Sequence, residues 1–204
     1  MAPRSTAVSV ARDEVGGRHR AQRACLPASG RHALVAYAGK MDGTKGIATA
    51  IGAELAGAGL QVTLLDAADV ESVERFDAVV LGSALYASRW RPDAVAVLKL
   101  LAERTSEGAS VPTWLFQSGP CGDGALTQQV APPKKVLRYA DKIGTAPPVT
   151  FGGRLDPATA TGFIARKMAT GELAGDFRDF DIIRAWGDRI AHTLTGPRST
   201  ASAT

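Results

Sequence analysis

Long apolar runs, cysteine and histidine are all scarce in this 204-residue chain. No stretch approaches the roughly 18 consecutive apolar residues of a membrane-spanning helix, so none is expected. Two cysteines do not form a disulfide framework. With only three histidines beside them, the usual four-ligand zinc site is also excluded, and we expect no metal site.

Basic charge is scarce outside the N-terminal segment, although the formal net charge is +4. Six of the 24 basic residues and two of the 20 acidic residues fall within residues 1–31, so the remainder is electrically balanced. A balanced domain has no positive excess with which to grip phosphate backbones. A nucleic-acid partner is therefore not expected.

The two ends of the chain lack the periodic apolar pattern of folded elements. Residues 1–30 are polar and contain no apolar core of a secretory signal, so we expect a disordered extension and a cytoplasmic protein. Residues 196–204 are expected to form a short tail. The segment between them, residues 31–195, is long enough to bury a core and is expected to fold as one domain.

Within that domain, short apolar runs alternate with amphipathic segments. The runs predict five strands, at residues 33–37, 61–66, 77–82, 112–117 and 149–151. The periodic segments predict helices at 44–58, from Pro92 onward, at 133–143 and at 181–194, the last with Ile182, Ile183, Trp186, Ile190 and Leu194 on one side. This alternation predicts an α/β fold in which helices cover both faces of a parallel sheet.

In open parallel sheets, ligands bind beyond the carboxyl ends of the strands. This rule points to the loops after Tyr37, Gly82 and Gln117. The first loop joins a strand to a helix N-terminus, where exposed amides and the helix dipole favour a phosphate group. It contains neither a Walker A motif nor G-x-G-x-x-G. Its residues are Ala38, Gly39, Lys40, Met41, Asp42, Gly43 and Thr44.

The second and third loops carry groups that suit a flat heteroaromatic ligand. Tyr86 and Trp90 follow the most apolar strand, where they either stack on such a ligand or pack beneath the next helix. The third loop is rich in glycine and poor in charge, which is consistent with backbone contacts to a ring edge or with an ordinary turn. It comprises Gln117, Ser118, Gly119, Pro120, Cys121 and Gly122. No basic residue close in sequence would activate Cys121, so we interpret it as a structural thiol.

These three loops together resemble those of flavodoxin-like proteins. Residues 35–48 are similar to that family's phosphate loop, residues 77–86 with Arg89-Trp90 to its second flavin loop, and residues 114–120 to its third. Residues 151–155 and 175–186 resemble a narrower branch, the flavodoxin-type menaquinone-dependent protoporphyrinogen dehydrogenases and their bacterial relatives. The resemblance implies a doubly wound five-stranded parallel sheet, order 2-1-3-4-5, and FMN as cofactor.

Carried over by position, the first loop would surround the FMN phosphate. Ala84, Leu85 and Tyr86 would border the isoalloxazine ring, with Trp90 nearby, and residues 117–122 would close its other edge. The flavin would carry the chemistry, so no catalytic side chain is required.

The first loop departs from the family pattern at three positions. Gly39 and Gly43 stand where the family usually has hydroxyl side chains. Asp42 stands where it usually has glycine, so its carboxylate would lie beside a phosphate dianion in a backbone that favours positive φ. We therefore expect weakened rather than abolished FMN binding.

Two functions follow as hypotheses. The first is an FMN-dependent oxidoreductase or electron-transfer protein, with a porphyrinogen or a quinone as small-molecule partner. The second is a flavin-free flavodoxin-like binding or regulatory module, which the altered first loop favours. An acidic pair after the first strand and the motif G-x-S-x-G are both missing, which excludes a response-regulator receiver and a serine hydrolase of the α/β type.

An insert, residues 154–175, separates the fifth strand from the last helix. Phe163, Ile164 and Met168 lie there beside Arg166 and Lys167. These residues form either an apolar surface for a porphyrin, a quinone or a membrane face, or a helix that packs back on the domain.

Overall fold

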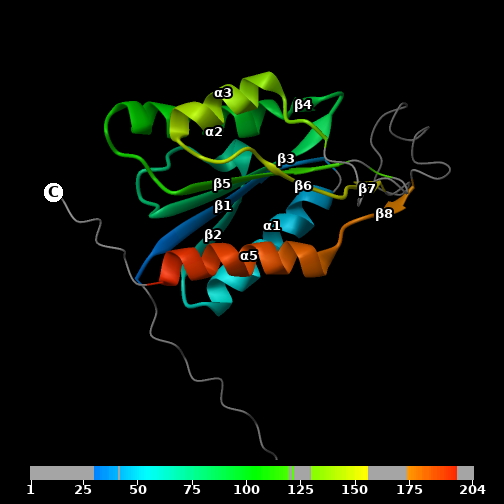
Figure 1. The fold of residues 1–204 in the computed structure, drawn as a ribbon, viewed down its shortest axis with the longest axis horizontal. Helices are drawn as coiled ribbons and strands as arrows, with labels where there is room; N and C mark the ends of the chain where they lie inside the picture. The colour runs from blue at the N-terminus through cyan, green and yellow to red at the C-terminus, as the bar shows by residue number, and fades with distance from the viewer. Residues whose placement is uncertain (1–29, 41, 120, 122–129, 156–173, 197–204) are drawn as a thin grey trace, which may run out of the picture.

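A parallel sheet forms the centre of the molecule in a computed structural model that describes residues 30–40, 42–119, 121, 130–155 and 174–196. Over these residues, five parallel strands follow the order β2-β1-β3-β5-β6 (Figure 1). They are β1 (His32–Ala38), β2 (Gln61–Asp66), β3 (Ala78–Tyr86), β5 (Thr113–Ser118) and β6 (Val149–Phe151). The remaining strand of the sheet, β4 (Arg89–Trp90), is an antiparallel two-residue addition to β3.

The predicted strand order is confirmed. Counting the parallel strands alone, the observed order is 2-1-3-4-5. Leu34, Val35, Val79, Val80 and Leu81 are completely buried, as expected for central strands that are covered on both faces.

The helices cover the sheet in two layers (Figure 1). The α1 and α5 helices pack on one face, and α2 and α3 pack on the other, each pair with its own apolar cluster. Their bounds are α1 (Gly43–Gly57), α2 (Pro92–Ser106), α3 (Lys134–Ile143) and α5 (Phe180–Thr195), with a short 3₁₀ turn η1 (Ala67–Asp69) after β2. None of the helices in the described ranges is long and apolar enough to span a membrane.

The inner face of α5 differs at one position from the prediction. Ile183, Trp186, Ile190 and Leu194 are buried, whereas the Ile182 side chain is 54% exposed. Adjacent residues of a helix point about 100° apart, so Ile182 and Ile183 cannot both face the sheet. The expectation that Ile182 belongs to this face is therefore wrong.

A short antiparallel pair follows β6. Its strands are β7 (Arg154–Leu155) and β8 (Gly175–Asp176), which lie at the two ends of the predicted insert. The expectations for residues 1–29, for Phe163, Ile164 and Met168 within the insert, and for residues 197–204 lie outside the described residues.

Candidate functional site

The loops after β1, β3 and β5 lie at one edge of the sheet because these strands are parallel neighbours. Ala38 is in register with Ser83, and Ala84 is in register with Ser118. The chain passes from β1 to β2 on one side and then to β3 on the other. This reversal between β1 and β3 is the switch point at which α/β sheets bind ligands.

The first loop ends, directly before α1, at a residue with a left-handed backbone conformation. Asp42 has φ of 51° and precedes Gly43, the first residue of the helix. Its exposed side chain does not cap the helix, and the first turn contains no acidic residue. The first-turn amides have no intrahelical acceptor and therefore remain suited to an anion. The positive φ expected at Asp42 is observed.

Close packing links the first loop to the third. The Thr44 side chain is buried, and its Oγ1 lies 2.7 Å from Ser118 Oγ. A Cβ atom added to Gly39 would lie 2.8 Å from the same Thr44 Oγ1. A hydroxyl side chain at position 39 would therefore collide with Thr44, which gives a physical reason for glycine there.

Tyr86, which the sequence placed in the second loop, is the last residue of β3 and lies at the sheet edge that carries the three loops. It ends β3 at a two-residue turn, Ala87-Ser88, in which both residues have positive φ, as in a type I′ hairpin. Burial raises the pKa of the Tyr86 phenol, while Arg91 and a hydrogen bond with the backbone of Lys40 act in the opposite direction. The phenol thus reaches from the second loop to the first.

Trp90, in contrast, belongs to the core. Its side chain is 5% exposed within the cluster beneath α2, and its Nε1 donates to Gln117 Oε1 at 3.1 Å. Of the two placements open from the sequence, Trp90 adopts the one beneath the helix. The place near the isoalloxazine ring that the resemblance implies for Trp90 stays a prediction.

Gln117 is also turned inward. It is fully buried, and its Nε2 donates to the Val130 carbonyl at 2.7 Å and to Thr150 Oγ1 at 3.0 Å. Its amide is therefore fully used in fastening the third loop to β6 and to the segment before α3. Gln117 shapes the site by holding this loop and does not present its side chain to a ligand.

The remaining third-loop residues have mixed outcomes. Ser118 faces Thr44, and Gly119, at φ of 130°, donates its amide to the Phe151 carbonyl at 3.0 Å. Burial raises the pKa of the Cys121 thiol, and the nearby Asp176 raises it further, so the thiol stays protonated near neutral pH. The other predicted residues, Met41, Pro120 and Gly122, lie outside the described residues.

Two arginine residues that were not predicted from the sequence as site residues border the first loop. Arg154 lies against Gly43, where an added Cβ would be 3.4 Å from the Arg154 Cβ. Arg178 donates from Nη1 to the Gly43 carbonyl at 3.3 Å. The available signal was the pair of glycines, Gly43 and Gly46, in the first turn of a helix, where glycine is unfavourable unless another group needs the space.

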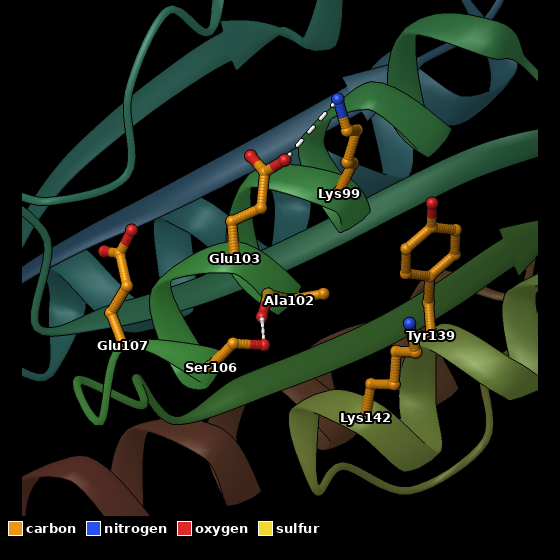
Figure 2. A pocket seen from close by; sticks show the side chains of 7 residues that line it. All are labelled: Lys99, Ala102, Glu103, Ser106, Glu107, Tyr139 and Lys142. Atoms are coloured by element: carbon orange, nitrogen blue, oxygen red, sulfur yellow. Dashed lines mark hydrogen bonds and ion pairs between the residues drawn. The ribbon is translucent and has the colours of Figure 1, made fainter.

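A concavity of about 360 Å³ lies between α2 and α3, away from these loops (Figure 2). It is lined by Lys99, Ala102, Glu103, Ser106, Glu107, Tyr139 and Lys142. Lys99 and Glu103 form an ion pair at 3.4 Å, but both side chains are more than half exposed. An exposed pair of this kind is a weak interaction and does not indicate a ligand site.

Comparisons with known proteins agree with this architecture. A family model for the flavodoxin domain matches residues 34–156, more than half of the chain. No curated protein sequence matches significantly.

Solved structures share the fold at low sequence identity. A flavodoxin from the domain Archaea is 14% identical with a TM-score of 0.51, over 80% of this chain and 98% of that one. Oxidised flavodoxin 1 from Bacillus cereus is 13% identical with a TM-score of 0.52, over 79% and 98%. The rubredoxin:oxygen oxidoreductase of Desulfovibrio gigas is 13% identical with a TM-score of 0.53, over 80% of this chain but 36% of that one.

Proposed function

The chain belongs to the flavodoxin domain family, and on that premise we propose that it binds FMN and transfers electrons through it. FMN is the cofactor of this family and supplies one- and two-electron redox chemistry when bound. The observation that carries the proposal is the uncapped N-terminus of α1 at the switch point of the sheet, with the loops after β3 and β5 beside it.

The residues around α1 fit a phosphate group. Gly39 and Gly43 carry no side chain over the backbone, so a phosphate can approach the first-turn amides. Lys40 is exposed on the same loop, and Arg154 and Arg178 border the first turn. These positive groups would favour a phosphate beside the first-turn amides, without the hydroxyls that residues 39 and 43 lack.

The last residues of β3 suit the ring. Ala84, Leu85 and Tyr86 lead away from the sheet edge, and Gly119 lies opposite Leu85, where an added Cβ would be 3.8 Å from the Leu85 Cβ. An aromatic phenol and glycine backbone at this edge support a flat ligand between the second and third loops. In this arrangement Tyr86 would stack on the ring and keep water from one of its faces.

For the substrate, we propose a porphyrinogen as hydrogen donor and a quinone as acceptor, in the cytoplasm with peripheral contact to a membrane. Each two-electron step would remove two hydrogen atoms from the porphyrinogen and convert one quinone to its quinol. The support is the resemblance of residues 151–155 and 175–186 to the protoporphyrinogen dehydrogenase branch. These segments include β7 and β8, whose Arg154 borders the first loop.

A second candidate is a flavin-free binding or regulatory module. It is favoured by the hydrogen bond that already engages the Thr44 hydroxyl with Ser118, and by the Asp42 carboxylate at the entrance to α1. Both features lower the affinity expected for a phosphate dianion.

The proposal is tested by incubating the purified chain with FMN, removing free flavin and recording the visible spectrum before and after reduction by dithionite. We expect a retained flavin that bleaches on reduction and is reoxidised by a soluble naphthoquinone. A folded chain that retains no flavin would favour the flavin-free module. Adding a porphyrinogen under anaerobic conditions in place of dithionite tests the substrate: retained flavin that the porphyrinogen does not reduce would leave the electron-transfer function and reject the proposed substrate.

A further inference from the structure

Arg178 is a buried cation at the first turn of α1. Its side chain is only 7% exposed, and its guanidinium lies 4.8 Å above the Phe180 ring. Its Nη1 donates to the Gly43 carbonyl at 3.3 Å, although residues 43 and 178 are far apart in the chain. The segment between β8 and α5 is thereby fastened to the start of α1.

The space for this guanidinium is made by Gly46. A Cβ atom at this position would lie 2.2 Å from Arg178 Nη1, which is too close for any substitution without movement. Glycine in a helix is less favourable than alanine. Glycine is needed at this position because the Arg178 guanidinium packs directly against the helix backbone there.

Asp176 fixes the orientation of the guanidinium. Arg178 Nε donates to Asp176 Oδ1 at 2.7 Å, and Nη2 donates to Oδ2, which makes a two-point pair. Such a pair holds the planar fork in one orientation and reduces the entropy lost when a further ligand is bound. Gly153 adds a backbone bond by accepting from the Phe177 amide at 3.0 Å, so the whole segment is anchored.

We propose that Arg178 is a positioning residue for the FMN phosphate, in place of the hydroxyl groups missing from the first loop at positions 39 and 43. This inference rests on the proposed FMN binding. Arg178 acts in two ways: it holds the first turn so that its amides face the phosphate, and it contributes positive potential beside that turn. Asp176 orients the guanidinium and offsets part of its charge.

The test compares FMN with riboflavin, which has the same ring and no phosphate, in fluorescence titrations of the full chain. In Arg178→Met, FMN affinity is expected to fall about fivefold or more, since a charge near the phosphate is lost, while riboflavin affinity changes less than about twofold. Arg178→Lys should restore part of the FMN affinity. Added NaCl should reduce the preference for FMN in the wild type more than in Arg178→Met.

Gly46→Ala provides an independent route, because the new methyl group must displace the guanidinium. Its matched control is Gly57→Ala, the same change in the last turn of α1, where nothing lies within 4 Å of the added atom. Gly46→Ala should reduce FMN affinity selectively, and Gly57→Ala should leave both flavins unaffected. If Arg178→Met does not fold, Arg178→Lys and Gly46→Ala still decide the question.

The outcomes separate the two proposals. Equal losses for FMN and riboflavin, or no loss for either, would show that Arg178 is only a structural anchor and would overturn the inference. A wild-type chain that binds both flavins equally would overturn it as well, while flavin binding itself would stand. A wild-type chain that binds neither would reject the proposed function and this inference with it.

Discussion

Asp42 shows how one residue combines backbone strain with unfavourable charge. Its φ of 51° lies in the left-handed region, where a side chain costs energy that glycine avoids. Its carboxylate lies beside the helix N-terminus that is proposed to receive a dianion. The side chain makes no capping hydrogen bond in return.

Replacing Asp42 by glycine should therefore raise both stability and FMN affinity. The relief of backbone strain should be worth about 1 kcal/mol in unfolding free energy. Asp42→Asn is the matched control, because it removes the charge and keeps a side chain that tolerates the same φ. Chemical denaturation and FMN titration of both variants separate the two effects. Unchanged FMN affinity in both would place the Asp42 carboxylate away from the phosphate.

Truncation of Tyr86 and truncation of Trp90 should affect different properties of the protein. Trp90→Ala removes a buried indole and its bond to Gln117, and should cost about 3–5 kcal/mol of unfolding free energy. Tyr86→Ala removes a half-buried ring and should cost less stability but weaken FMN binding several-fold. Urea denaturation of the flavin-free proteins and flavin titration measure the two quantities. A Tyr86→Ala variant with normal FMN affinity would remove the second loop from the site.

The strand pattern of the sequence predicts where the loops lie, but it does not predict how their side chains are oriented. Tyr86 and Trp90 are four residues apart at the same strand end, and only the β3–β4 hairpin sends one toward the first loop and the other beneath α2. Gln117 has partners in Val130 and Thr150, which are remote in sequence. Such pairings depend on tertiary packing, which periodicity does not encode.

Among the elements, the crossing of α1 and α5 depends on a small residue. A Cβ atom at Gly187 would lie 3.2 Å from the Glu54 Cβ and 3.3 Å from the Ile51 Cα. These are tighter than ordinary contacts, so glycine sets how closely the two helices approach. The sheet face beneath them is then covered by Ile51, Ile183 and Trp186.

Gly187→Ala should accordingly destabilise the protein by about 1–3 kcal/mol, as overpacked cores do, despite the better helix propensity of alanine. Gly57→Ala in α1 is the control, because it adds the same methyl group where nothing is near and should be neutral or stabilising. Thermal unfolding of both variants provides the comparison. A Gly187→Ala protein that is as stable as the wild type would mean that α5 can move away from α1 with little loss of free energy.

The main helices and parallel strands were predictable because their apolar periodicity extends over many residues. Predicted and observed bounds of α1, β2 and β6 agree within about one residue. The two-residue strands β4, β7 and β8 are too short to carry a period, so they were missed. Arg154 and Asp176 lie in these strands and Arg178 follows them, so this part of the candidate site was missed as well.

In the whole molecule, the C-terminal segment returns to the N-terminal end of α1, and the Asp176–Arg178 pair closes this connection. The hydrogen bonds from Arg178 hold the pKa of Asp176 below its ordinary value of 3.8, against the opposing effect of burial. A lowered folded-state pKa means that the unfolded chain binds the proton more readily. The ionised Asp176 therefore stabilises the folded protein above about pH 4. This stabilisation is lost as the pH falls through the folded-state pKa of Asp176.

Asp176→Asn should thus be less stable than the wild type near neutral pH, and the difference should shrink under acid conditions. The Asp176 side chain is 42% exposed, so solvent screening keeps the effect modest. Urea denaturation at about pH 6 and about pH 3 measures it. A difference that stays constant over this range would show that the carboxylate charge does not stabilise the connection.

We propose that this flavodoxin domain binds FMN through the N-terminus of α1 and the loops after β3 and β5. The most direct test is a titration of the purified chain with FMN, followed by flavin fluorescence at fixed ionic strength. We expect saturable binding of one FMN per chain with a Kd of about 1 μM or tighter, equivalent to about −8 kcal/mol. A chain that unfolds cooperatively, yet shows no saturable FMN binding up to about 1 mM, would contradict it.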